Sequence, residues 1–95
     1  MSNLSIMYIT IKNMNIFEYE NYRKIIKKWI SEQPKQGHGQ NLKMAQHLRM
    51  DASIFSKILN EERELGIENA YLLAEYMGLI PIEKEYFIHL ALLEK

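Results

Sequence analysis

Residues 41–60 contain two short helical patterns separated by a break, and this pairing constrains the possible fold more than any other feature. The apolar residues of each pattern recur at the spacing of one helix face: Leu42, Ala45 and Leu48 in the first, and Phe55, Ile58 and Leu59 in the second. Asp51, just before the second pattern, is a favourable N-cap. The small side chain of Ala45 would let two helices cross closely, at about 90–120°. The segment therefore predicts two helices joined by a tight turn.

The second predicted helix carries short side chains and one long cation on the face away from its apolar residues. These residues are Ala52, Ser53, Ser56 and Lys57. Such a face suits a helix whose N-terminal end approaches base edges in the major groove of DNA. Ser53 can hydrogen-bond to a base edge, Ala52 can pack on a thymine methyl, and Lys57 can reach a guanine or a phosphate. We therefore predict a helix-turn-helix that binds double-stranded DNA, with an ordinary αα-hairpin in a helix bundle as the alternative.

Residues outside that face would contact the DNA backbone. Asn41, at the start of the first helix, is placed to bind a phosphate through its side chain and the free N–H groups of the helix. Lys43 and Arg49 would add positive charge. The formal net charge of the chain is zero, but residues 1–60 carry nine Lys/Arg against four Asp/Glu, and residues 61–95 carry three against eight. This asymmetry favours attraction of a polyanion to one side of the molecule.

The segment resembles the Cro/repressor type of helix-turn-helix. In that family an alanine and a turn glycine, four residues apart, precede a polar N-cap, an apolar residue, a serine and a second apolar residue. The residues that match these places, other than the glycine, are Ala45, Asp51, Phe55, Ser56 and Ile58. Arg49 stands where the glycine is expected. The resemblance implies a left-handed backbone at Arg49, a conformation that costs an L-residue roughly 1–2 kcal/mol.

The resemblance extends over residues 14–95. Residues 16–30, IFEYENYRKIIKKWI, are similar to the opening of the N-terminal domain in a family of poorly characterised bacterial regulators, with Asn21 in place of the usual aspartate. Residues 62–79 and 83–95 are similar to the two closing helices of that domain. The resemblance implies a sequence-specific DNA-binding domain that regulates transcription. Members of the family usually continue into a C-terminal regulatory region, which would begin where this sequence stops.

A strong amphipathic helix is predicted over residues 18–32, with an apolar stripe that runs from Tyr22 to Ile30. The opposite side is basic and would face either phosphate or solvent: Arg23, Lys24, Lys27 and Lys28. Residues 34–40 predict a loop, because Pro34 and two glycines interrupt the helical pattern.

Two more helices complete a predicted all-α fold of five helices. The fourth ends at Gly78, which would act as a left-handed cap. Pro81 breaks the chain, and the fifth helix begins at about Ile82. Its main apolar face contains Tyr86, Phe87, Leu90 and Ala91. Ile88 and Leu92 lie off that face, which predicts that the last helix contacts a partner as well as the core.

Residues 1–13 precede this domain as an N-terminal arm or a tail. Residues 5–11, SIMYITI, are β-branched and aromatic and predict a strand with no second strand to pair with in the chain. An arm of this kind could pair with the same segment of a second subunit. The sequence therefore predicts a homodimer that forms through the last helix, the arm, or both.

The sequence contains no recognisable metal-binding, catalytic or cofactor-binding motif. It has no cysteine, and His38, His47 and His89 are not at the spacing of metal ligands. No catalytic or cofactor-binding motif is present, so we expect no enzyme, no cofactor and no metal. No apolar run is long enough to span a membrane, and no signal peptide is visible, so we expect a cytoplasmic protein without a membrane partner.

The alternative function is a protein-interaction module, such as an antitoxin-like or adaptor subunit that uses the helix-turn-helix only as a scaffold. Three glutamates at 61, 62 and 64, near the end of the proposed reading helix, favour this alternative because they would repel phosphate.

Overall fold

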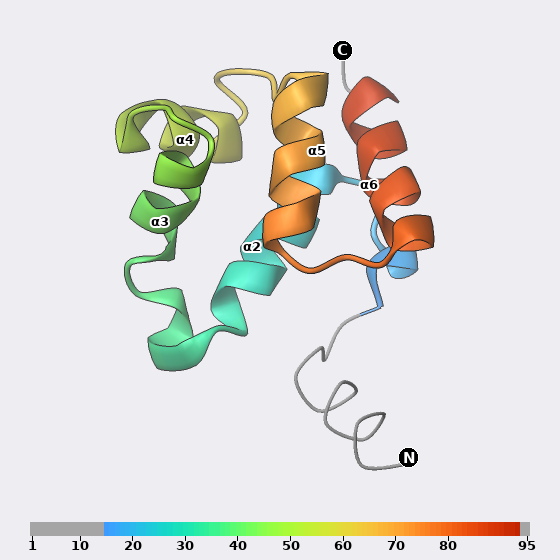
Figure 1. The fold of residues 1–95 in the computed structure, drawn as a ribbon, viewed down its shortest axis with the longest axis horizontal. Helices are drawn as coiled ribbons and strands as arrows, with labels where there is room; N and C mark the ends of the chain where they lie inside the picture. Colours follow the sequence, from blue (N-terminus) through green and yellow to red (C-terminus); the bar gives the residue numbers. More distant parts are fainter. Residues whose placement is uncertain (1–14, 94–95) are drawn as a thin grey trace.

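The computed structural model describes residues 15–93, which form five α-helices and two short 3-10 turns (Figure 1). In chain order the elements are η1 (Ile16–Glu18), α2 (Tyr22–Ser31), η2 (Pro34–Gly37), α3 (Gln40–His47), α4 (Ala52–Leu59), α5 (Ile67–Tyr76) and α6 (Pro81–Leu93). Residues 15–93 contain no strand, so the predicted all-α class with five helices is confirmed. The predicted N-terminal arm, with its strand at 5–11, lies outside the described residues.

The first helix begins at Tyr22, four residues later than predicted, because Asn21 caps it. The Asn21 Oδ1 accepts hydrogen bonds from the backbone N–H groups of Arg23, at 2.7 Å, and Lys24, at 3.4 Å. Two of the N–H groups that a helix start leaves without a partner are satisfied in this way. The preceding residues instead form η1, where Asn15 accepts a hydrogen bond from the Phe17 N–H.

The core is assembled from one face of each helix. Tyr22 and Phe87, both fully buried, meet edge to face with ring centroids 6.2 Å apart, and so join α2 to α6. The Tyr22 hydroxyl also accepts a hydrogen bond of 3.2 Å from the Leu65 N–H, which fixes the loop before α5. In Figure 1, α3 and α4 lie at one end of the molecule, α6 lies at the other, and α5 lies between them.

Helices α3, α4 and α5 end in the same way, with a left-handed residue one position beyond the cap. These residues are Arg49, with φ 59°, Glu61, with φ 67°, and Gly78, with φ 74°. After α3, the Met50 N–H bonds to the Ala45 carbonyl and the Arg49 N–H to the Gln46 carbonyl. This is the Schellman arrangement, which satisfies carbonyl groups at a helix end. The left-handed backbone predicted at Arg49 and at Gly78 is therefore confirmed.

The last helix starts at Pro81, one residue before the predicted position. Proline suits the first position of a helix because its missing N–H would have no helical partner there. The Glu83 carboxylate, which is buried, accepts a hydrogen bond of 3.0 Å from the Ile80 N–H just outside the helix. Pro81 therefore opens α6 and does not merely interrupt the chain.

One predicted core position is wrong. Leu42 is 54% exposed, whereas Met44, Ala45 and Leu48 form the buried side of α3. A spacing of three places Leu42 and Ala45 about 60° apart around a helix, so the face predicted through Leu42 is displaced from the true one. None of the helices described is long and apolar enough to cross a membrane.

Candidate nucleic-acid interface

Helices α3 and α4 pack against each other across the four-residue turn 48–51. Ala45 is fully buried, as its predicted role at a close helix contact requires, and Phe55 on α4 is fully buried as well. Asp51 occupies the predicted N-cap position with an extended backbone, but its side chain makes no capping hydrogen bond. The Asp51 carbonyl instead accepts from the N–H groups of Ile54 and Phe55, which begins the helix.

The outer face of α4 carries the side chains that the sequence assigns to base contacts. Ser53 and Lys57 are exposed, and Ala52 and Ser56 are half-buried. The opposite face holds the buried residues Phe55, Ile58 and Leu59, as predicted. The helix thus presents small and polar groups near its start and a cation near its end.

The residues predicted to contact the DNA backbone lie in two separate parts of the structure. Arg49 is exposed in the turn that leads into α4, shortly before the first residue of that helix, Ala52. Lys43 is exposed on α3, and Asn41 is half-buried in its first turn. Since α3 rises about 1.5 Å per residue, Asn41 lies roughly 10 Å along the helix from the turn. Asn41 therefore stands apart from Arg49 and the α4 residues.

Arg23 is a residue of this region that the sequence reasoning missed. It is predicted on the basic side of α2, but it is only 6% exposed. Its Nε donates a hydrogen bond of 2.6 Å to the Ile58 carbonyl, and its Nη2 donates one of 2.9 Å to the Arg63 carbonyl. Arg23 therefore ties α2 to the last turn of α4 and to the loop that follows it. The signal that could have found it is its spacing, three residues before Ile26 on the buried stripe.

The rest of the basic side of α2 remains at the surface. Lys24 and Lys27 are exposed, and the Lys28 ammonium lies 3.0 Å from the Glu32 carboxylate one turn later. The hydrogen bond to Glu32 raises the pKa of Lys28 above its usual range. Lys28 is thus engaged within its own helix.

The glutamates after α4 gather beside two guanidinium groups. Glu61, Glu62 and Glu64 are exposed, and they line a polar hollow together with Arg23 and Arg63. The proximity of positive charge offsets part of the negative charge that these carboxylates would present to a polyanion. Across residues 40–60 themselves, the chain carries three Lys/Arg and one Asp.

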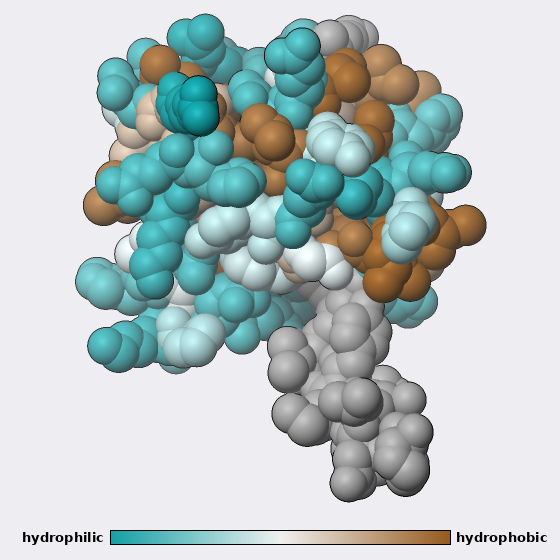
Figure 2. All heavy atoms as spheres, in the orientation of Figure 1, coloured by the Kyte–Doolittle hydropathy of each residue, from teal (hydrophilic) through white to brown (hydrophobic). Residues whose placement is uncertain are grey.

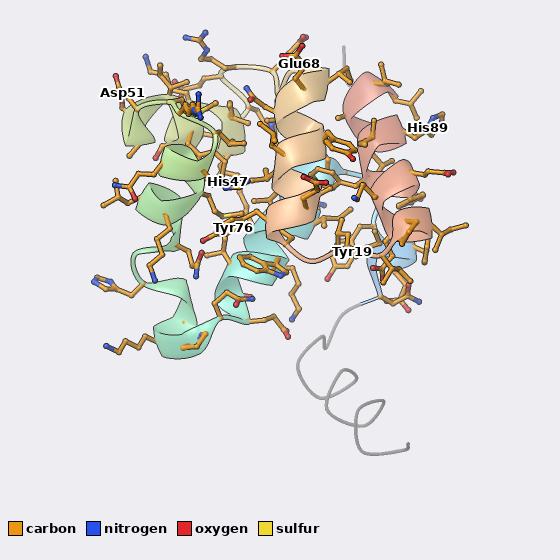
Figure 3. All side chains as sticks on the ribbon, viewed as in Figure 1. Tyr19, His47, Asp51, Glu68, Tyr76 and His89 are labelled. Carbon is orange, nitrogen blue, oxygen red and sulfur yellow. The ribbon has the colours of Figure 1, made fainter. Side chains whose placement is uncertain are left out.

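Histidines do not assemble into a metal site in the described part of the chain. Residues 15–93 contain no group of three or more His, Asp or Glu side chains that could hold a metal ion. The His47 ring contacts the Tyr76 ring, with centroids 5.1 Å apart, and the Tyr76 hydroxyl donates a hydrogen bond to Gln40. His47 thus supports the contact between α3 and α5, and Figure 3 shows it well separated from His89 on α6.

Known proteins do not identify a function for this chain, so its function must be inferred from the geometry of α3 and α4. A scan against protein-family models found no match, and searches of curated proteins and of solved structures found none either. Function is therefore assigned from the burial, charge and hydrogen bonding of the side chains in this chain.

Proposed function

We propose that this chain binds double-stranded DNA in a sequence-specific manner and regulates transcription, with α3 and α4 acting as a helix-turn-helix of the Cro/repressor type. The observation that carries the proposal is the outer face of α4. Its small, polar and cationic side chains are at the surface, while the other face is locked into the core beside α3. A regulator of transcription of this kind would work in the cytoplasm.

In this proposal the N-terminal half of α4 enters the major groove. Ser53 hydrogen-bonds to a base edge, and Ala52 packs against a thymine methyl. Lys57, one turn further along, reaches the O6 or N7 atom of a guanine or a phosphate. Ser56 lies on the same face, between Ser53 and Lys57 along the helix, and its hydroxyl can donate or accept a hydrogen bond.

Arg49, Lys43 and Asn41 bind phosphates and fix the position of α4 in the groove. Contacts from the two cations and Lys57 would neutralise about three phosphates. Each neutralised phosphate contributes about −0.9 to the slope of log K against log salt concentration, so one copy would give a slope of roughly −2.7. This modest slope agrees with the low net charge of the chain.

We also propose that the chain binds DNA as a homodimer that forms through its last helix. A hollow between α5 and α6 is bordered by four apolar or aromatic side chains and one carboxylate: Ile67, Tyr71, Leu72, Ile88 and Glu68. Tyr71 is 46% exposed and Leu72 is 36% exposed. In dimeric helix-turn-helix proteins the two reading helices contact half-sites about 34 Å apart on the same side of the DNA, and a second copy on this hollow would have to meet that spacing.

The test is selection of bound sequences from a random duplex library, followed by mobility shift at low and moderate salt. We expect Lys57→Glu to abolish specific binding, since a good base-edge contact alone is worth about 1–3 kcal/mol. Lys27→Glu, which makes the same charge change on the exposed side of α2, is the matched control and should retain the sequence preference. Equal loss in both variants would contradict the assignment of α4. No shift of any duplex by the parent would favour the protein-interaction alternative.

A further inference from the structure

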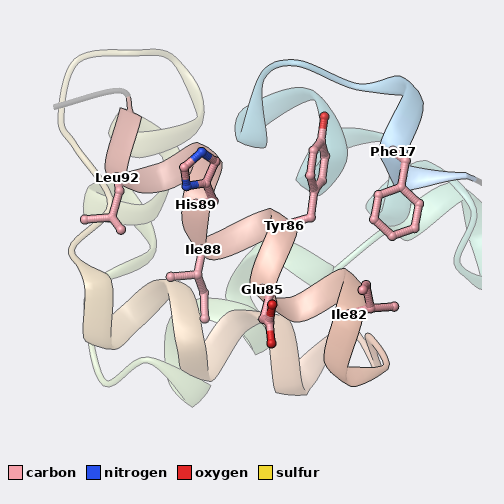
Figure 4. Close-up of a pocket in the computed structure, with 7 residues that line it drawn as sticks. All are labelled: Phe17, Ile82, Glu85, Tyr86, Ile88, His89 and Leu92. Carbon is pink, nitrogen blue, oxygen red and sulfur yellow. The ribbon is translucent and has the colours of Figure 1, made fainter.

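An apolar groove lies along the exposed side of α6, next to η1 (Figure 4). Its volume is about 580 Å³. Five apolar or aromatic side chains line it, together with Glu85 and His89: Phe17, Ile82, Tyr86, Ile88 and Leu92. Ile82 is 61% exposed, Leu92 50% and Phe17 46%, so the groove presents large apolar groups to solvent. Figure 2 shows hydrophobic side chains gathered on the side of the molecule that carries α6.

One wall of the groove is fixed by contacts between η1 and α6. The Tyr86 hydroxyl donates a hydrogen bond to the Tyr19 carbonyl. The rings of Phe17 and Tyr86 lie against each other, with centroids 5.2 Å apart. The Asn15 side chain accepts a hydrogen bond from the Phe17 N–H, which holds the backbone of η1 at this wall. The apolar surface of the groove is therefore formed before any partner binds, which lowers the cost of binding.

The charges around the groove favour a cationic partner. The two elements that line it, η1 and α6, contain three glutamates and one lysine. That lysine, Lys84, lies 3.6 Å from the Glu75 carboxylate and 4.9 Å from the centroid of the Tyr71 ring, so it is engaged with α5. Glu85 is exposed in the groove and forms no ion pair with any residue between 15 and 93. The Glu85 carboxylate therefore attracts positive charge to the groove.

An α-helix suits the groove better than an extended segment. The exposed side of α6 offers side chains and no free backbone groups, so an extended partner would bury N–H and C=O groups without hydrogen-bond partners. A helix satisfies its own backbone and can lie along α6 at an interaxial distance of about 8–10 Å. From Ile82 to Leu92, α6 rises about 15 Å, so a partner helix of about three turns covers the groove.

We propose that this groove binds an amphipathic helix of another protein, one whose apolar stripe is bordered by Lys or Arg. The stripe covers the exposed side chains of Phe17, Ile82 and Leu92, and a cation beside it pairs with Glu85.

Within residues 15–93, no helix of a second copy offers such a surface. The basic helix α2 packs its apolar stripe against its own core. Helix α3 exposes only one large apolar side chain, Leu42, and α4 exposes none. The exposed apolar side chains of α5 and α6 lie beside glutamates. The occupant is therefore assigned to a different protein.

The groove is distinct from the surfaces proposed for the homodimer and for DNA. It shares only Ile88 with the hollow between α5 and α6. None of its residues belongs to α3 or α4, and Figure 1 shows these helices at the opposite end of the molecule from α6. The proposal does not depend on DNA binding, so each of the two functions can fail while the other is still measured.

The experiment measures the binding of synthetic peptides to the full chain by fluorescence anisotropy. The leucine–lysine peptide has about 15 residues, with leucines at the spacing of one helix face and lysines elsewhere. A second peptide replaces each lysine by glutamate, and a third has the composition of the first with its leucines spread around the helix. We expect the leucine–lysine peptide to bind about tenfold more tightly than either of the others, because only it supplies both an apolar anchor and a cation.

Paired variants test the residues of the groove. Ile82→Ser with Leu92→Ser should weaken binding of the leucine–lysine peptide about tenfold. Leu42→Ser, which alters a comparably exposed leucine on α3, should leave it unchanged. Glu85→Gln should weaken binding about two- to fivefold, the range of an exposed ion pair. Glu68→Gln, which removes an exposed carboxylate from α5, should have no effect.

Three results would overturn the proposal. Equal binding of the leucine–lysine peptide and either of the other peptides would show that the groove does not select an apolar stripe bordered by cations. Equal binding by the parent and by the variant with serine at 82 and 92 would place the peptide elsewhere. Loss of self-association in that variant, measured by sedimentation, would show that a second copy fills the groove.

Discussion

Replacing Arg49 by glycine should make the protein more stable and weaken its proposed binding to DNA. Arg49 is held at φ 59° because it is the left-handed residue of the cap on α3, where the Met50 N–H bonds to the Ala45 carbonyl at 3.0 Å. This conformation costs an L-residue roughly 1–2 kcal/mol, a cost that glycine does not have. The exposed side chain makes no packing contribution that glycine would forfeit in the core.

The expected gain is smaller than the full relief of strain. Glycine adds conformational freedom to the unfolded chain, which costs about 0.4–1 kcal/mol of stability. The two ranges leave between no change and about 1.6 kcal/mol of stabilisation, with central values of about 0.5–1 kcal/mol. For a domain of this size, 1 kcal/mol shifts Tm by about 4–8 °C, so Arg49→Gly should raise Tm by roughly 2–8 °C. Urea and thermal unfolding, followed by far-ultraviolet circular dichroism, would measure the change.

Glu61→Gly is the matched control. Glu61 holds the same position after α4, with φ 67°, and its neighbour Glu62 makes the corresponding hydrogen bond to the Lys57 carbonyl at 2.8 Å. Both variants should gain similar stability. Only Arg49→Gly should reduce DNA affinity, with a salt slope smaller by about one unit, because only Arg49 is proposed to contact a phosphate.

Two results would refute this reasoning. A clear loss of stability in both glycine variants would show that the left-handed conformation is not a source of strain at these helix ends. Unchanged DNA affinity and salt slope for Arg49→Gly, in a protein that does bind DNA, would remove Arg49 from the proposed interface.

Three further substitutions test the packing around α3 and α4. Arg23→Met should cost about 2–4 kcal/mol in urea unfolding, because the buried Ile58 carbonyl and the partly buried Arg63 carbonyl lose their donor, and a cost below about 0.5 kcal/mol would contradict the tie between α2 and α4. Ala45→Leu should cost about 1–3 kcal/mol by overfilling the contact between α3 and α4, and full retention of stability would mean that the helices have room to separate. Leu42→Asp should change stability by no more than about 0.5 kcal/mol, since the side chain is exposed, and a large loss would place Leu42 in the core after all.

The features that the sequence predicted correctly depend on local patterns. The apolar spacing of Phe55, Ile58 and Leu59 identified the buried face of α4, and its complement identified Ser53 and Lys57 as surface residues. The helix stops at positions 49 and 78 were also predictable. The conformation of each stop is determined by residues within one turn of the helix end.

The wrong predictions have two physical causes. In a helix of eight residues such as α3, only two turns are available, so the apolar pattern fits two adjacent faces and Leu42 is assigned to the wrong one. Arg23 is misplaced because its acceptors lie 35 and 40 residues away in the sequence. The spacing of Arg23 from Ile26 indicates only that it faces the core, while no local pattern contains its acceptors, and a cation on a helix is usually solvated.

The hydrogen bonds of Arg23 have a consequence for how the outer face of α4 can change. Arg23 holds the backbone oxygens of Ile58 and Arg63, and every amino acid supplies such an oxygen. Arg23 and the buried face of α4 therefore hold the helix in position, and these contacts involve no side chain on its outer face. Residues 53, 56 and 57 can be exchanged while the helix stays in place, so that a new ligand preference could arise by substitution at the surface alone.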